Sequence, residues 1–211
     1  MAGFTGFPEA ALDFYDDLET DNSKSYWAAH KDTYELAVRR PMAALLSELE
    51  AELGPGKAFR PYRDVRFAKD KTPYKTHQGG YVATSQSTGW YVQVSARGVM
   101  VGAGFYGATS AGLARFRDAI VDDTRGVGFE RLVHRLVADG WELGGDRLRT
   151  TPRGYDADHP RIALLRHKTL SLSRWYGFDP VIHGPQLVDE VRQDWRRLQP
   201  VVEWVGDNAT G

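Results

Sequence analysis

Residues 60–77 read Arg-Pro-Tyr-Arg-Asp-Val-Arg-Phe-Ala-Lys-Asp-Lys-Thr-Pro-Tyr-Lys-Thr-His and concentrate positive charge. From Lys57 to His77 there are seven Lys or Arg residues and two Asp residues, a local net charge of +5, whereas the whole chain of 211 residues carries −1. Guanidinium groups bind carboxylate and phosphate through paired hydrogen bonds, and aromatic side chains offer flat surfaces for stacking. This segment, the basic stretch, therefore predicts an anion-binding site.

Apolar and polar residues alternate at the start of the basic stretch, which predicts a β-strand over residues 59–67. Arg63 falls on the same face as Phe67, so we expect its stem to be packed and its head to pair with an acid on a helix. Arg66 falls on the opposite, polar face and is expected to point into a cleft. A turn is expected around Pro73, because proline cannot donate a backbone hydrogen bond to a sheet.

The candidate site follows from these two faces. The expected ligand-binding residues are Arg60, Tyr62, Arg66, Lys69, Lys71, Tyr74, Lys75, Lys168 and Arg174. The last two would complete the cluster only if their strand, late in the chain, lies beside the basic stretch. The expected structural residues are Arg63, Phe67 and Pro73. If the protein is an enzyme, the cations would stabilise developing negative charge, and the candidates for proton transfer are His77, Asp64 and Tyr74.

The excess of cations leaves open what neutralises them. Asp64 lies within reach of Arg66, and such a pair would only hold the stretch in shape. Residues 1–56 carry eleven acidic and four basic residues, so part of this acidic surface could face the basic stretch, although charge runs are usually solvated. A small phosphorylated or carboxylated ligand is the leading expectation. The alternatives are docking on an acidic protein partner and binding of single-stranded nucleic acid, which the shortness of the basic stretch disfavours.

The spacing Arg-x-x-Arg-Asp-x-Arg-Phe-x-x-x-Lys-x-Pro-Tyr, which runs from Arg60 to Tyr74, resembles the signature of an uncharacterised bacterial family, domain of unknown function 2461. The general layout of the chain also resembles that family from about Phe7 to Val205, including a Gly-rich hairpin after the signature. The family implies no activity. The resemblance therefore indicates the type of fold and leaves the function open.

The composition limits the classes of protein to consider. With 42% apolar residues and six Trp, the chain can bury a substantial core, and its length suits one domain. The absence of cysteine excludes disulfides and thiolate chemistry and fits a reducing compartment. We see no signal peptide and no apolar run of membrane-spanning length, so we expect a cytoplasmic protein that does not contact membranes. No nucleotide-binding motif is present, and no cofactor is expected.

The only cluster with the side chains of a metal site is formed by Asp156, Asp158 and His159. Asp158 also stands where the N-cap of a following helix is expected, which is the simpler interpretation. We therefore predict no metal site. If an ion did bind there, hard ions that prefer oxygen ligands would suit these carboxylates better than zinc.

We predict an α+β fold with a mainly antiparallel sheet and with N- and C-terminal helices packed on one face. A single domain, residues 1–211, would comprise a helical part (1–56), a sheet-rich core with inserted helices (57–176), a C-terminal helix (177–205) and a flexible tail (206–211). Within the core, a strand from Tyr74 to Thr84 would be broken at Gly79-Gly80. Gly102 and Gly104 share one bare strand face, where either a packed helix or a ligand could approach closely.

Overall fold

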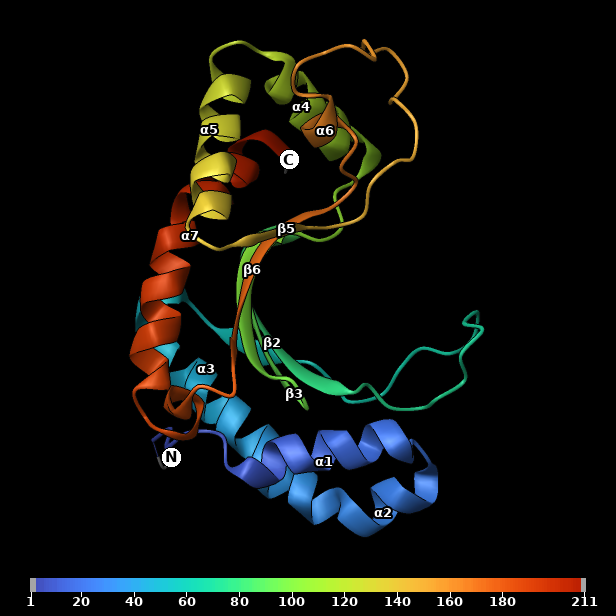
Figure 1. Cartoon of the computed structure of the whole chain (residues 1–211), viewed down its shortest axis with the longest axis vertical. Coiled ribbons are helices and arrows are strands. Elements are labelled where there is room, and N and C mark those ends of the chain that lie inside the picture. The colour runs from blue at the N-terminus through green and yellow to red at the C-terminus, as the bar shows by residue number, and fades with distance from the viewer. Residues whose placement is uncertain (1–2, 210–211) are drawn as a thin grey trace. The chain divides into compact units, whose positions relative to one another are not determined.

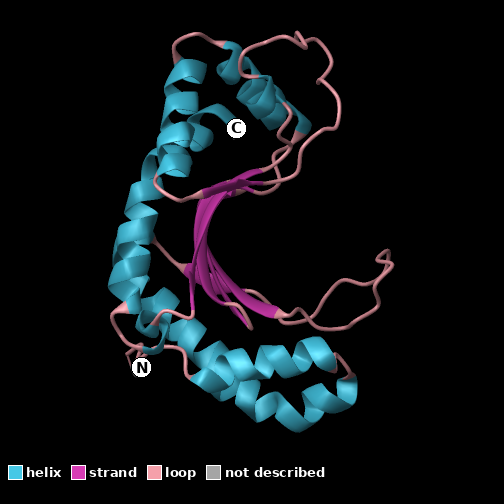
Figure 2. Cartoon of the chain, viewed as in Figure 1, coloured by secondary structure: helices cyan, strands magenta, loops and turns pink. Residues whose placement is uncertain are grey.

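The computed structural model describes residues 3–209 and has an α+β architecture, as predicted (Figure 1). Helices lie at both ends of the chain, and the strands between them form one sheet (Figure 2). The helical segments are α1 (Glu9–Thr20), α2 (Lys24–Thr33), η1 (Tyr34–Arg39), α3 (Arg40–Leu53), α4 (Ser110–Val121), α5 (Arg125–Ala138), α6 (Ile162–Leu165), η2 (Pro180–His183) and α7 (Leu187–Ala209). The strands are β1 (Gly56–Ala58), β2 (His77–Ser85), β3 (Thr88–Ser95), β4 (Gly98–Phe105), β5 (Glu142–Gly144) and β6 (Leu170–Gly177).

The six strands form an antiparallel sheet in the order β1-β2-β3-β4-β6-β5. Strands β3 and β4 are neighbours joined by a short turn, and they are the Gly-rich hairpin that the family resemblance implies after the signature. The two shortest strands, β1 and β5, are the edges of the sheet, where short strands leave few unpaired backbone groups. Strands β2, β3 and β4 stand between β1 and β6 in this order.

The contacts between backbone positions divide the chain into two compact units. The first unit comprises the chain up to Val82 together with residues 91–101 and 175–193. The second unit comprises residues 83–90, residues 102–174 and the chain from Asp194 onward. Each unit buries apolar side chains of its own.

In the first unit, the predicted helical part, residues 1–56, contains α1, α2, η1 and α3. The side chain of Ser23 accepts a hydrogen bond from the backbone of Tyr26 (3.1 Å), so Ser23 caps α2 after the break at residues 21–22. The π-helical segment η1 joins α2 to α3 just before Pro41. Pro41 has no N–H to donate to the preceding turn, and this explains why the regular helix changes there.

Strand β2 is continuous, so the predicted break at Gly79-Gly80 is wrong. A Cβ atom on Gly80 would lie 2.8 Å from the sulfur of Met42 and 3.0 Å from a methyl group of Leu46, both on α3. The glycine therefore allows α3 to lie close to the sheet, and it does not end the strand. Met42 and Leu46 are buried in this contact.

In the second unit, a cluster of aromatic rings joins α4, α5 and α7. The ring of Phe129 stacks on Trp204 with centroids 3.9 Å apart, and Phe116 meets Trp204 edge to face at 5.8 Å. Such contacts contribute about 0.5–1.5 kcal/mol each beyond the area they bury. Phe116 and Phe129 are fully buried, so this cluster is the core of the unit.

Helix α7 passes Pro200 and continues to Ala209, so the predicted flexible tail is wrong for residues 206–209, while residues 210–211 lie outside the described part. Ala209 is buried, and its carbonyl oxygen lies 2.1 Å from where a Cβ of Gly112 would stand. Glycine at this position therefore lets the end of α7 contact α4. Over residues 3–209, no helix combines the length and the apolar character that crossing a membrane requires.

The nearest neighbours of Gly102 and Gly104 are residues of the adjacent strand β6. A Cβ atom on Gly102 would lie 2.6 Å from the carbonyl oxygen of Leu172, and one on Gly104 would lie 2.0 Å from that of Leu170. Both carbonyls belong to the adjacent strand β6. The two glycines therefore permit a close approach between strands, which neither predicted alternative included, and the ligand alternative stays a prediction.

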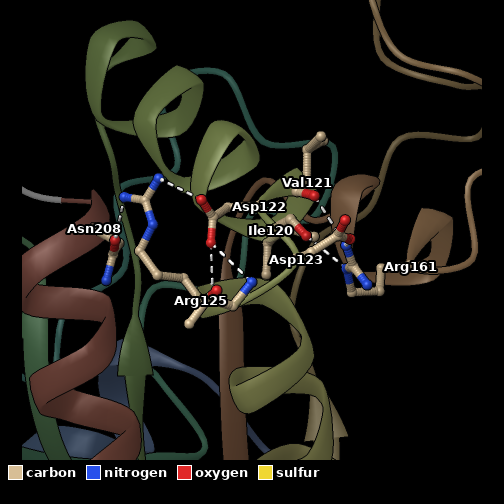
Figure 3. A network of polar contacts seen from close by, with 8 residues as sticks. Ile120, Val121, Asp122, Asp123, Arg125, Arg161 and Asn208 are labelled. Carbon is tan, nitrogen blue, oxygen red and sulfur yellow. Dashed lines mark hydrogen bonds and ion pairs between the residues drawn. The ribbon is translucent and has the colours of Figure 1, made fainter.

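Arg161 ties the end of α4 to the loop before α6 (Figure 3). Its side chain is only 5% exposed and donates to the carbonyl oxygens of Ile120 (2.7 Å) and Val121 (2.9 Å). These carbonyls belong to the last turn of a helix, where no backbone N–H follows to pair with them. The remaining contact, to the carboxylate of Asp123 at 3.1 Å, is made to a side chain that is 99% exposed.

We expect Arg161→Leu to lower the free energy of unfolding by about 2–4 kcal/mol, because it leaves buried carbonyl groups unpaired. Urea denaturation measures this change. In the matched control Asp123→Asn, the loss is expected to stay below about 1 kcal/mol, since an exposed ion pair contributes little. Equal losses in the two variants would contradict the assignment of Arg161 to the helix end.

Candidate functional site

The basic stretch lies in a long connection between β1 and β2, residues 59–76, which we call the basic loop. Its residues form no regular strand, so the strand predicted over residues 59–67 is wrong. A single antiparallel bridge between Tyr62 and Tyr74 closes the neck of the loop. Figure 1 shows the loop extending from the sheet.

Local hydrogen bonds explain why this alternating sequence does not form a strand. Asp64 accepts a hydrogen bond from the backbone of Arg66 (3.3 Å), and Asp70 accepts one from the backbone of Thr72 (2.9 Å). Such side-chain acceptors compete with a neighbouring strand for backbone donors. Pro61 has no N–H to offer a ladder. The alternation of residue types was therefore misleading as a sign of β-structure.

Two side-chain amides hold the ends of the basic loop. At its start, the buried side chain of Gln78 donates to the carbonyl oxygen of Phe59 (2.7 Å) and accepts from the hydroxyl of Tyr34 (2.6 Å). At its end, the amide of Asn22 donates to the carbonyl of Tyr74 (3.0 Å) and accepts from its N–H (3.1 Å). The loop is thus attached both to β2 and to the connection between α1 and α2.

The ring of Tyr74 strengthens the second attachment. It is stacked on Trp27 with centroids 4.1 Å apart and planes inclined by 7°, and the ring of Tyr62 lies 5.6 Å from it. Tyr74 is 7% exposed, and burial, followed by the nearby Tyr62, raises the pKa of its hydroxyl. Tyr74 therefore anchors the loop, and it stays protonated at neutral pH.

At the tip of the loop, Arg66 pairs with Asp64. The guanidinium donates to both carboxylate oxygens, at 2.9 and 2.6 Å, which is the two-pronged geometry that arginine favours. Hydrogen bonds from Arg66 lower the pKa of Asp64 and raise that of Arg66. The expectation that Arg66 points into a cleft is wrong, because its exposed side chain is bound to this internal partner.

Arg63 makes a second internal pair. Its guanidinium donates to Asp70 and to the hydroxyl of Thr72. The hydrogen bond from Arg63, followed by those from the backbone and the hydroxyl of Thr72, lowers the pKa of Asp70 to about 2. The prediction that Arg63 pairs with a helix acid is therefore wrong. The prediction of a packed face that includes Phe67 is also wrong, since Phe67 is 96% exposed. Pro73 contributes its carbonyl to the closure of the neck, where it accepts from the N–H of Arg63 (2.9 Å).

These pairs use both acids of the basic stretch. Of the seven cations between Lys57 and His77, five have no carboxylate partner among residues 3–209. They are Lys57, Arg60, Lys69, Lys71 and Lys75. Lys71 donates to the carbonyl of Val65 (2.9 Å), and Lys75 lies over the ring of Phe59, 5.3 Å from its centroid. The acidic helices of residues 1–56 therefore do not supply the missing negative charge through any ion pair of the described part.

A hollow of about 480 Å³ lies beside the neck of the loop. Its lining residues are Glu19, Asn22, Arg63, Asp70, Thr72, Tyr74, Thr76 and His77. Burial, followed by the charge of Lys75, lowers the pKa of His77, so its imidazole is neutral at neutral pH. Of the three candidates for proton transfer, His77 and Tyr74 meet at this hollow, whereas Asp64 lies at the loop tip. Glu19 and Asn22 escaped the sequence analysis because nothing in their local pattern distinguishes them from other helix-end residues.

The comparison with protein families finds a match over most of the chain. Residues 10–204 match the model of a family described as conserved hypothetical protein, DUF2461. The chain belongs to this family. The resemblance inferred from the basic stretch and the general layout is thereby confirmed. No curated protein and no solved structure matches the chain.

Two expected members of the site, Lys168 and Arg174, do not join the basic loop. Arg174 lies in β6, and Lys168 lies two residues before its start. Strand β6 is separated from β1 by three other strands, so the condition for including them is not met. Lys168 lies 4.0 Å from the carboxylate of Asp146, and Arg174 lies 3.3 Å from that of Asp194. Strand order depends on long-range pairing, which the charge pattern of a short segment does not encode.

The acidic cluster near α6 adopts a local turn. Asp156 accepts a hydrogen bond from the backbone of Asp158 (2.9 Å), and the imidazole of His159 accepts one from the backbone of Arg161 (3.0 Å). The N-cap of α6 is Arg161, so the expectation that Asp158 caps this helix is wrong. Across residues 3–209, no three His, Cys, Asp or Glu side chains gather as metal ligands would.

The two internal pairs give a prediction with a built-in control. In Arg63→Gln, the pKa of Asp70 is expected to rise from about 2 toward its ordinary 3.8, while Asp64 stays unchanged. In Arg66→Gln, only the pKa of Asp64 is expected to rise. An NMR titration of the carboxyl carbons measures both values.

The stability that the pair of Asp70 and Arg63 contributes depends on pH, and the lowered pKa of Asp70 gives the direction of this dependence. Its pair with Arg63 is fully formed above pH 3.8 and is lost as the pH falls toward about 2. If Arg66→Gln shifted Asp70 instead, the pairing within the loop would have to be reassigned.

Proposed function

We propose that this chain binds a small molecule carrying a phosphate or carboxylate group at the base of the basic loop. The observation that supports this most directly is the pair of cations Arg60 and Lys75. The backbone N–H of Lys75 donates to the carbonyl of Pro61 (2.8 Å), so Lys75 lies opposite the residue that follows Arg60. Burial and, after it, the charge of Arg60 lower the pKa of Lys75. Neither has a carboxylate partner within residues 3–209. An anion placed between them would relieve their repulsion.

The surroundings of this pair suit a ligand with a flat body. Lys57 is the register partner of Tyr81 in the β1–β2 ladder, and the ring of Tyr81 lies 6.2 Å from that of Phe59, with planes inclined by 21°. Phe59 is 38% exposed and carries Lys75 over its ring. We call Lys57, Phe59, Arg60, Lys75 and Tyr81 the base cluster. It combines three cations with two aromatic rings, which suits an anionic group attached to an aromatic or sugar ring.

The remaining ligand-binding candidates contribute less to this proposal. Arg66 and Lys71 have partners within the loop, and Tyr74 is stacked on Trp27. Lys69 is exposed at the loop tip and is not part of the base cluster. Of the ligand-binding residues predicted from the sequence, Arg60 and Lys75 are the two that belong to the base cluster.

One observation favours a second candidate, docking of the loop tip on an acidic protein partner. Phe67 is the most exposed of the large apolar residues, and it lies between Arg66 and Lys69 in sequence. An exposed ring flanked by cations is typical of a docking surface whose partner is acidic with an apolar pocket. Single-stranded nucleic acid would need a longer run of cations and stacked rings than this tip offers.

Isothermal titration calorimetry at low salt tests the small-ligand proposal with phenyl phosphate and inorganic phosphate as probes. We expect phenyl phosphate to bind more tightly, because its ring adds contact with Phe59 and Tyr81. Arg60→Gln and Lys75→Gln are each expected to weaken binding about tenfold or more, the cost of losing one hydrogen bond to a charged group. Arg60→Gln is expected to keep or slightly raise stability, because it removes a repulsion.

Lys168→Gln serves as the matched control, since it removes a lysine outside the base cluster and should leave the affinity unchanged. Absence of binding by either probe would reject a small anion at the base cluster. In that case, binding of a poly-glutamate peptide that is lost in Phe67→Ser would support the docking alternative.

A further inference from the structure

A second hollow, of about 560 Å³, lies within the second unit between α5 and the C-terminal part of α7. Three arginines line it, Arg135 from α5, Arg174 from β6 and Arg197 from α7. Its size falls in the range of sites for small organic molecules. None of these residues belongs to the basic loop or to the base cluster.

A buried carboxylate positions two of the three guanidiniums. Asp194 has a side chain only 3% exposed, and one of its oxygens accepts from Arg174 and from Arg197, each at 3.3 Å. Arg174 also donates to the carbonyl of Asp139 (2.8 Å) and lies 4.6 Å from the centroid of the Trp141 ring. Because Arg174 has these three contacts, it serves mainly to fix the wall of the hollow.

Arg197 and Arg135 are the two exposed arginines of the hollow. The side chain of Arg197 is 51% exposed, although it also contacts Asp194. Arg135 is exposed and has no carboxylate partner within residues 3–209. The hollow is lined by three arginines and by one acid, Asp139, with Asp194 behind them, so its charge is close to +1 and a single carboxylate would neutralise it.

The rest of the lining is apolar. Leu132 and Leu136 lie one helical turn apart on α5, on the same side as Arg135, and Pro200 faces them from α7. Leu136 is 7% exposed and Trp141 is 2% exposed, so both are already packed and offer a firm wall. A ligand with a short apolar body would cover these side chains while its charged end meets the arginines.

We propose that this hollow binds an organic carboxylate with a short apolar body, with the carboxylate on Arg135 and Arg197 and the apolar part on Leu132, Leu136 and Pro200. The site is independent of the base cluster, so either proposal can fail without the other. It also gives Arg174 a role as a positioning residue, in a different place from the one its sequence suggested.

The test uses hexanoate and, as the matched neutral probe, hexan-1-ol, with ligand-observed NMR and calorimetry on the full chain at low salt. We expect hexanoate to bind at least tenfold more tightly than hexan-1-ol. Arg135→Gln is expected to weaken hexanoate binding at least tenfold. Because the side chain of Arg135 has no carboxylate partner among residues 3–209, this variant should unfold at the same urea concentration as the wild-type protein.

Two controls separate this site from unspecific attraction and from the base cluster. Arg153→Gln removes an exposed arginine away from the hollow, and Arg60→Gln removes one from the basic loop; both should leave hexanoate binding unchanged. The proposal is overturned if hexanoate does not bind, if hexan-1-ol binds equally well, or if Arg153→Gln weakens binding as much as Arg135→Gln.

Discussion

The candidate site depends on two side-chain amides that hold the ends of the basic loop. Gln78 binds the carbonyl of Phe59, and Asn22 binds both backbone groups of Tyr74. Ordering the backbone of a loop costs about 1–2 kcal/mol of conformational entropy per residue. The hydrogen bonds of Gln78 and Asn22 offset part of this cost. Held at both ends, the loop keeps the backbone of Lys75 hydrogen-bonded to Pro61, next to Arg60, despite the like charges of Arg60 and Lys75.

The cations of the loop then fall into two groups with different roles. Arg63 and Arg66 are used by Asp70 and Asp64, and these pairs shape the turns of the loop. Both pairs are exposed to solvent, so they define geometry more than they add stability. The cations left at the base have aromatic neighbours instead of acids. A structural ion-pair network would pair these cations with acids, and their lack of acidic partners is the reason for proposing a binding surface at the base of the loop.

Much of the fold was predictable because its signals are local. The α+β class, the hairpin of β3 and β4, and the helix start at Ser23 follow from periodicity and capping. The excess charge of the basic stretch was equally visible. The loop conformation was not predictable in this way. Alternation of residue types favours a β-strand, but here Asp64 and Asp70 bind their own neighbouring backbone instead. A local sequence pattern does not determine strand order either. The sequence therefore could not decide whether Lys168 and Arg174 lie beside the basic stretch.

The central claim is that Arg60 and Lys75 at the base of the loop, and not the paired arginines, meet the anion. The most direct measurement is an NMR titration that follows the side-chain N–H signals of the arginines while phenyl phosphate is added. The account predicts that the signal of Arg60 moves with ligand concentration while those of Arg63 and Arg66 stay in place. Movement of the Arg66 signal with a fixed Arg60 signal would contradict it, because the anion would then bind at the loop tip.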